Sequence, residues 1–128
     1  MRIRGVDFVQ ITVPNGQMAA AKAFYGGVLG LLEDGIMNES WAEYRAGALT
    51  IALDADPFLP PPWDRQPGGE IRIALAVDDV AEAVSELRQK GVEPEFGPEE
   101  FDPCTLASVR DPFGNVVILH RRTDGTAG

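Results

Sequence analysis

Cysteine and histidine are almost missing from this chain, which has one of each, Cys104 and His120. A single cysteine excludes an internal disulfide framework and a cysteine-rich zinc site, and it suits a reducing compartment such as the cytoplasm. The chain does not begin with a charged segment followed by an apolar stretch. No run approaches the roughly 18 apolar residues of a membrane-spanning helix. We therefore expect a soluble, cytoplasmic protein.

Positive charge is also scarce: 11 lysines and arginines stand against 20 acidic residues, which gives a formal net charge of -9. Such a protein repels phosphate backbones and anionic lipids, so neither nucleic acid nor a membrane is an expected partner. Acidic side chains concentrate between residues 93 and 102, which indicates a solvated face or attraction of a cationic small molecule. The apolar share of 45% and the length of 128 residues predict one globular domain with a packed core.

The first half of the chain predicts a strand, a helix and three further strands. Residues 6–13 are rich in β-branched and aromatic types and stop at the turn sequence Pro14-Asn15-Gly16. An apolar stripe at helical spacing follows and ends at Gly30; it consists of Met18, Ala21, Tyr25, Val28 and Leu29. Gly26 and Gly27 each cost roughly 1 kcal/mol in a helix, so we expect this turn to pack closely against a neighbour. Short apolar runs predict antiparallel strands at 31–37, 41–46 and 48–54.

The second half repeats this order after a proline-rich linker over residues 55–69. Residues 71–77 predict a strand, and Asp79 with Glu82 forms a capping box before a helix that Gly91 ends. Three more strands are expected near 92–96, 104–110 and 115–121. We therefore expect a single domain over 1–128, made of two βαβββ modules at about 5–54 and 70–121, with a disordered tail at 123–128.

Three segments at matching places in this layout resemble one known family. They are Phe24-Tyr25-Gly26-Gly27-Val28-Leu29-Gly30-Leu31, Ala76-Val77-Asp78-Asp79-Val80-Ala81-Glu82-Ala83 and Asp111-Pro112-Phe113-Gly114-Asn115. Together they are similar to the vicinal oxygen chelate superfamily, which includes glyoxalase I, extradiol dioxygenases and bleomycin-resistance proteins. The resemblance implies an α+β fold in which the tandem modules form a curved, mostly antiparallel sheet with a ligand cavity. It also implies a homodimer.

The chemistry of that superfamily resides in four inward-facing strand positions, usually filled by His, Gln or Glu, which bind a divalent metal. Carried over to this chain, the four positions are Phe8, Ala52, Arg72 and Ile118. None of these side chains offers a lone pair, and arginine carries a like charge, so we expect no metal and no cofactor. If they face inward, Phe8, Ala52 and Ile118 would make an apolar pocket, or they simply fill the sheet interior.

A shift of two residues keeps the sheet face and gives a second candidate metal set. Its members are Gln10, Asp54, Glu70 and His120. The competing interpretation is that Asp54, Glu70 and His120 are solvated strand ends and that Gln10 faces a wet cavity. Cys104 is expected to pack as a small core residue rather than to act as a nucleophile.

Three long side chains complete the candidate ligand site. On the cavity side, Arg72 could grip a carboxylate or phosphate, and an ion pair within the chain or an outward position is the alternative. Trp41 opens a strand and could instead pack in the sheet. Trp63 lies in the linker, where it and Phe58 could form a lid or merely anchor the loop.

These features predict a metal-free protein that binds a small organic ligand, aromatic or antibiotic-like, similar to the drug-sequestering bleomycin-resistance members. The expected ligand-binding residues are Phe8, Gln10, Trp41, Ala52, Trp63, Arg72 and Ile118. The alternative is a lyase, isomerase or oxygenase that uses the shifted metal set, or a metal-free catalyst in which Arg72 stabilises an oxyanion. A third possibility is a ligand-sensing domain with a partner protein.

Overall fold

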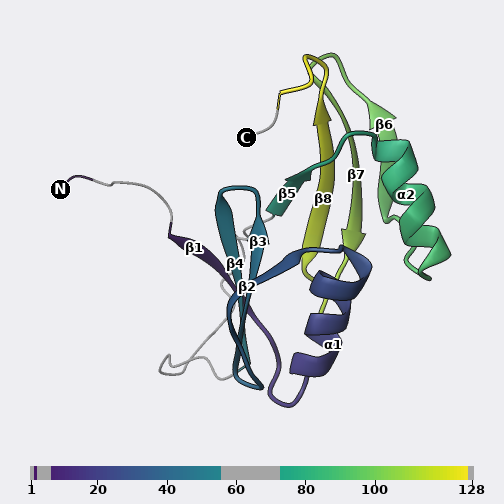
Figure 1. Ribbon diagram of the computed structural model, residues 1–128. Coiled ribbons are helices and arrows are strands. Elements are labelled where there is room, and N and C mark those ends of the chain that lie inside the picture. The colour runs from purple at the N-terminus through teal and green to yellow at the C-terminus, as the bar shows by residue number, and fades with distance from the viewer. Residues whose placement is uncertain (1, 3–6, 56–72, 127–128) are drawn as a thin grey trace, which may run out of the picture. The chain divides into compact units, whose positions relative to one another are not determined.

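The computed structural model in Figure 1 describes residues 2, 7–55 and 73–126. The chain divides into two compact units, 1–65 and 66–128. The described part of each unit forms one four-stranded mixed sheet with few helices, and the sheets are open rather than closed. This confirms the predicted α+β class with tandem βαβββ modules.

The first unit follows the predicted order of elements. They are β1 (Phe8–Thr12), α1 (Met18–Lys22), η1 (Ala23–Val28), β2 (Leu32–Met37), β3 (Trp41–Ala46) and β4 (Leu49–Asp54). The strand order in the sheet is β1-β4-β3-β2, with β1 parallel to β4 and the other neighbours antiparallel. Because β4 lies between β1 and β3, side chains from three strands share each central face of the sheet.

The core of the first unit lies between the sheet and the helical segment α1–η1. Its most deeply buried side chains are Val13, Met18, Ala21, Tyr25, Ala42, Tyr44, Ile51 and Leu53. The helix changes to a π-helix at Ala23, where Leu29 N–H donates to the carbonyl of Phe24, five residues back. A Cβ on Gly26 would lie 3.0 Å from the Tyr44 ring, which confirms the predicted close packing there. A Cβ on Gly27 would meet open space, so the turn packs against Tyr44 through Gly26.

The second unit repeats the topology of the first. Its elements are β5 (Ile73–Ala76), α2 (Val80–Gln89), β6 (Phe96–Glu100), β7 (Cys104–Arg110) and β8 (Val116–Arg122). The strand order is β5-β8-β7-β6, and β5 is parallel to β8. Figure 1 shows α2 running alongside β6, β7 and β8, where it buries Val80, Val84 and Leu87. The same chain order thus gives the same sheet order in both units.

One predicted helix cap and one predicted turn in the second unit are confirmed. Asp79 Oδ1 accepts the Glu82 N–H at 2.9 Å, which caps the start of α2. The buried carboxylate of Asp111 accepts the backbone N–H groups of Phe113 and Asn115 at 2.9 and 2.8 Å. It also accepts the side-chain amide of Asn115 at 2.7 Å. These hydrogen bonds to the Asp111 carboxylate stabilise the turn between β7 and β8.

The strand predicted near 92–96 was placed too early, because β6 begins at Phe96. Val92 N–H still donates to the carbonyl of Leu87, so this segment belongs to the exit from the helix. Gly97 and Pro98 lie inside β6, where its pairing with β7 is irregular. Because β6 is an edge strand, the missing proline N–H costs no ladder bond.

The described part of the predicted tail, 123–126, forms hydrogen-bonded turns. Thr123 N–H donates to Pro103 O, and Thr126 N–H donates to the Asp124 carboxylate at 2.9 Å. The hydrogen bonds from the backbone N–H and then from the hydroxyl of Thr126 lower the pKa of the exposed Asp124. Among the described residues, no helix is both long and apolar enough to cross a membrane.

Candidate functional site

Strand alternation gives the first sheet two chemically different faces. One face packs against α1 and η1, as the contact between Gly26 and Tyr44 shows. We call the other side the Trp41 face. The register of β1, β4 and β3 places nine side chains on it: Phe8, Gln10, Thr12, Trp41, Glu43, Arg45, Thr50, Ala52 and Asp54. Four of the predicted ligand-binding residues therefore share one face: Phe8, Gln10, Trp41 and Ala52.

An aromatic pair crosses the Trp41 face. The ring centroids of Phe8 and Trp41 are 5.8 Å apart and their planes meet at 86°, an edge-to-face contact. Phe8 stands opposite Thr50 on β4. Trp41 stands opposite Asp54 on the same strand. Ala52 is therefore at the midpoint between the two aromatic positions, and it is fully buried.

Polar groups flank Ala52 on both sides. The Gln10 side-chain amide donates to Asp54 Oδ2 at 2.8 Å, between the neighbouring strands β1 and β4. Asp54 is only 7% exposed. The interpretation of Asp54 as a solvated strand end is therefore wrong, because its carboxylate is buried and hydrogen-bonded. On the other side, Glu43 Oε1 accepts the indole N–H of Trp41 at 2.7 Å.

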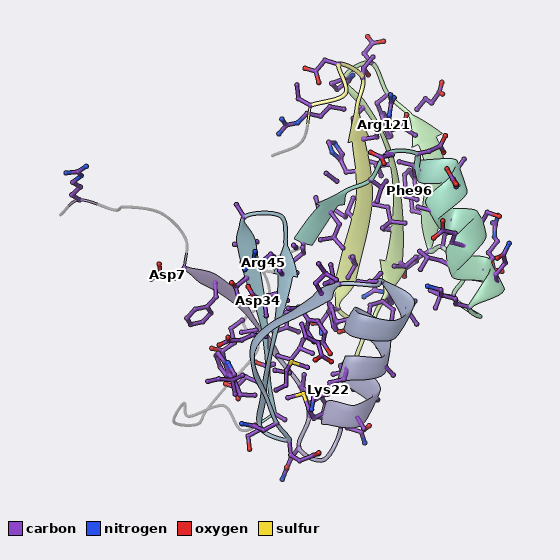
Figure 2. The ribbon with its side chains drawn as sticks, in the orientation of Figure 1. Asp7, Lys22, Asp34, Arg45, Phe96 and Arg121 are labelled. Atoms are coloured by element: carbon purple, nitrogen blue, oxygen red, sulfur yellow. The ribbon has the colours of Figure 1, made fainter. Side chains whose placement is uncertain are left out.

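The rim of the Trp41 face is charged and exposed. Figure 2 labels Asp34 and Arg45, which lie together on β2 and β3. Their carboxylate and guanidinium atoms are 2.9 Å apart. Phe8 remains 48% exposed and Leu32, opposite Arg45, is 72% exposed. The exposed part of Phe8 thus leaves apolar surface available to a ligand at the aromatic pair, while Leu32 lies at the opposite edge of the sheet.

The corresponding face of the second sheet carries both apolar and polar side chains, and it lacks such an aromatic pair among its described residues. Ile118 stands between Ala74 on β5 and Ser108 on β7. His120 follows on the same face, between Ala76 and Leu106. Both Ile118 and His120 are half-buried, so His120 is neither a fully solvated strand end nor a core residue.

Several predicted site residues lie outside the described part of the chain. They are Trp63, Arg72 and Glu70, together with Phe58. The structure describes Cys104 as a half-buried free cysteine at the start of β7, directly opposite Arg122. It is therefore less enclosed than a core position would be.

The acidic stretch between residues 93 and 102 is a solvated surface. Glu93 pairs with Arg88 at 3.0 Å, and Glu95 pairs with Arg110 at 2.7 Å, all with side chains about half exposed or more. Exposed ion pairs of this kind contribute little to stability. The remaining acids, Glu99, Glu100 and Asp102, are also exposed.

The described residues do not fit the divalent metal that the fold family implies. Phe8, Ala52 and Ile118 have no donor atoms. In the shifted set, the side-chain amide of Gln10 already donates to Asp54. Within the described ranges, no group of three or more His, Cys, Asp or Glu side chains could hold a metal ion.

The sequence places this fold in a family of known architecture. Residues 7–119 match the Glyoxalase/Bleomycin resistance protein/Dioxygenase superfamily. Because the match spans most of the chain, the protein belongs to this superfamily, as its motifs predicted. No curated protein matches the chain in sequence at a significant level.

Solved structures share the fold over nearly the full chain. A glyoxalase family protein from Bacillus anthracis is 26% identical, with a TM-score of 0.74, over 96% of this chain and 100% of its own. TnmS3, an antibiotic binding protein from Streptomyces sp. CB03234, is 24% identical, with a TM-score of 0.70 and coverage of 95% and 100%. A lactoylglutathione lyase from Agrobacterium tumefaciens is 18% identical, with a TM-score of 0.68 and coverage of 92% and 95%. At such identities the last two show the fold alone.

Sequence reasoning missed Glu43. The alternation of Trp41, Glu43 and Arg45 along one strand could have placed all three on a common face. It could not have shown that the carboxylate meets the indole, because that contact depends on side-chain orientation.

Proposed function

We propose that this protein binds a small aromatic, antibiotic-like ligand without a metal, at the Trp41 face. The observation that carries the proposal is the edge-to-face pair of Phe8 and Trp41 on a sheet face where Phe8 remains 48% exposed. Aromatic side chains supply large apolar area and a geometry for stacking, which is how small-molecule sites gain affinity.

Polar groups beside the pair support orientation of such a ligand. The Gln10–Asp54 hydrogen bond and the Glu43 carboxylate border the buried Ala52. A few fixed polar groups within an apolar surface are typical of sites that hold one ligand in one pose. The antibiotic-binding relative from Streptomyces shares the fold, so the architecture is compatible with this use.

The absence of donor atoms at Phe8, Ala52 and Ile118 supports binding without a metal, since none of these side chains can ligate a cation. Arg72, as a cation for an anionic group on the ligand, and Trp63, as an aromatic contact, remain predicted ligand-binding residues, and both lie outside the described residues.

A cytoplasmic location and a homodimeric state form part of the same proposal. A single cysteine suits the cytoplasm, and similarity to short two-module members of the superfamily favours a homodimer. Sedimentation of the purified chain would measure the second point, with a monomer at micromolar concentration contradicting it.

The binding proposal is tested with a neutral aromatic probe, N-phenyl-1-naphthylamine, whose fluorescence rises on apolar burial. We expect Phe8→Leu to weaken probe binding by about three- to tenfold, since an aromatic contact contributes about 0.5–1.5 kcal/mol. The matched control is Phe101→Leu, which removes an aromatic ring of similar exposure from the second unit and should leave binding unchanged. Equal affinities for the parent and Phe8→Leu would contradict the proposal. Chemical turnover of an identified ligand would favour the enzyme alternative.

A further inference from the structure

A single carboxylate joins the Trp41 side chain to the backbone of the adjacent strand. Glu43 Oε1 accepts the indole N–H at 2.7 Å, and Glu43 Oε2 accepts the Ile36 N–H at 3.3 Å. Both oxygens of the half-buried carboxylate are therefore engaged, one by the aromatic side chain on β3 and the other by β2. A charged acceptor makes such bonds stronger than those between neutral groups.

The irregular pairing of β2 creates the space for this carboxylate. The register between β2 and β3 shifts between Glu33 and Met37. Gly35 lies within the shift at a φ of 110°, a conformation that favours glycine. A Cβ at Gly35 would collide with Glu43 Oε2. Gly35 is therefore favoured for two reasons: it adopts the positive φ of the backbone, and its lack of a Cβ leaves room for the Glu43 carboxylate.

The bond to Glu43 limits where the indole can lie. Trp41 and Phe8 stand on β3 and β1, with β4 between them, yet their ring centroids are 5.8 Å apart. To meet Phe8, the indole must extend over the sheet toward the position of Ala52, which is fully buried. A side chain with two rotatable bonds keeps one such orientation when its only polar atom is hydrogen-bonded.

We propose that Glu43 is a positioning residue that holds Trp41 in its contact with Phe8 and so preorganises the aromatic surface before a ligand binds. The positioning is a property of the ligand-free chain, whereas its effect on affinity rests on the proposed function. Preorganisation raises affinity because less side-chain ordering has to accompany binding.

The first test uses protein with Glu43 intact and needs no ligand. In a Trp63→Phe background, Trp41 is the one remaining tryptophan, so its indole N–H gives a single resonance. We expect exchange of this proton with solvent to be at least about tenfold slower than in a free indole, as for a hydrogen-bonded donor. Exchange at the free rate would overturn the proposal.

The second test separates positioning from general stability. In the same background, Glu43→Ala should red-shift Trp41 emission and weaken its near-ultraviolet circular dichroism, while Glu43→Gln, which keeps an oxygen acceptor, should restore most of both. Asp34→Ala is the matched control, because it removes a carboxylate that binds Arg45 on the same sheet. Unchanged spectra in a folded Glu43→Ala variant, or equal changes in Asp34→Ala, would overturn the role. Far-ultraviolet circular dichroism reports folding in each case.

Binding of N-phenyl-1-naphthylamine distinguishes failure of this role from failure of the proposed function. We expect Glu43→Ala to bind the probe about three- to tenfold more weakly than the parent, the cost of ordering one side chain. Altered spectra with unchanged probe affinity would retain the positioning and reject its link to binding. A protected indole in a parent protein that binds no probe would reject the proposed site and leave the positioning role in place.

Discussion

At the scale of single residues, Tyr44 is a buried and closely packed side chain with an acidic neighbour. It is 1% exposed, its ring touches Gly26, and Glu33 stands opposite it on β2. Burial, and then the negative charge of Glu33, raise the pKa of Tyr44 above its ordinary value of 10.0. The unfolded chain releases this proton at the ordinary value, so the folded state binds more protons above about pH 10. Stability should therefore fall as the pH rises through this range.

Replacement of Tyr44 by phenylalanine removes the titrating hydroxyl. We expect the free energy of unfolding of Tyr44→Phe to fall less steeply with pH than that of the parent between about pH 9 and about pH 11. Urea denaturation of both proteins at several pH values measures the two slopes. The slopes, rather than the absolute stabilities, carry the test, because the substitution also alters packing. Parallel slopes would show that Tyr44 does not contribute.

The sequence predicted the sheet face on which a residue lies better than it predicted the side chains that the residue contacts. Alternation along β3 places Trp41 and Glu43 on one side of the strand, and alternation along β1 does the same for Phe8 and Gln10. The sequence could not show that Phe8 and Trp41 meet, because that contact depends on β4 lying between their strands. Nor could it show that Asp54 is buried, since its cover comes from other parts of the chain.

At the scale of elements, the π-helix η1 shows how glycine can be used in two ways. The turn that contains Gly26 and Gly27 was expected to pack against a neighbour, and it does so through Gly26, which lies against Tyr44, while Gly27 meets open space. Hydrophobic periodicity predicted the position of this helical segment but not its change to π-type hydrogen bonding at Ala23. That change depends on contacts with the sheet, which a local pattern does not contain.

Alanine substitutions at these two glycines should have opposite effects. Gly26→Ala brings a Cβ to 3.0 Å from the buried Tyr44 ring, so we expect destabilisation of about 1–3 kcal/mol. Gly27→Ala meets open space and should stabilise the protein by up to about 1 kcal/mol, because glycine loses more backbone entropy on folding. Thermal and urea unfolding of both variants measure the difference. Equal effects would mean that the Tyr44 contact does not govern this turn.

At the scale of the whole molecule, the repeated order of elements was the most predictable property. Turn sequences and apolar runs placed β2, β3 and β4 within one residue of their observed bounds, and the second unit repeats the same sheet order. β6 was predicted near 92–96, whereas it begins at Phe96 and includes Gly97 and Pro98. Their tolerance in the edge strand follows from the sheet order, which only the assembled unit defines.

Metal content is the property of the whole protein that most directly separates the two classes of function. We expect no stoichiometric divalent metal in protein purified without an affinity tag, including after incubation with nickel, zinc, manganese or iron(II), because the carried-over positions provide no donor set. Elemental mass spectrometry measures this. If the protein holds a stoichiometric metal and His120→Ala loses it, the metal-free proposal is wrong. The metal ligands would then belong to the shifted set that includes His120.

The pairing of the first strand of each unit with its last has a consequence for synthesis. The two parallel strands of each sheet, β1 with β4 and β5 with β8, lie side by side in space. Along the chain, however, a helical segment and two other strands separate them. No unit can complete its sheet until its final strand has been translated. The first unit has all four strands once residue 54 has emerged from the ribosome, whereas the second must wait for residue 122, near the end of the chain. Folding during translation should therefore proceed in two stages, with the aromatic Trp41 face assembled in the earlier one.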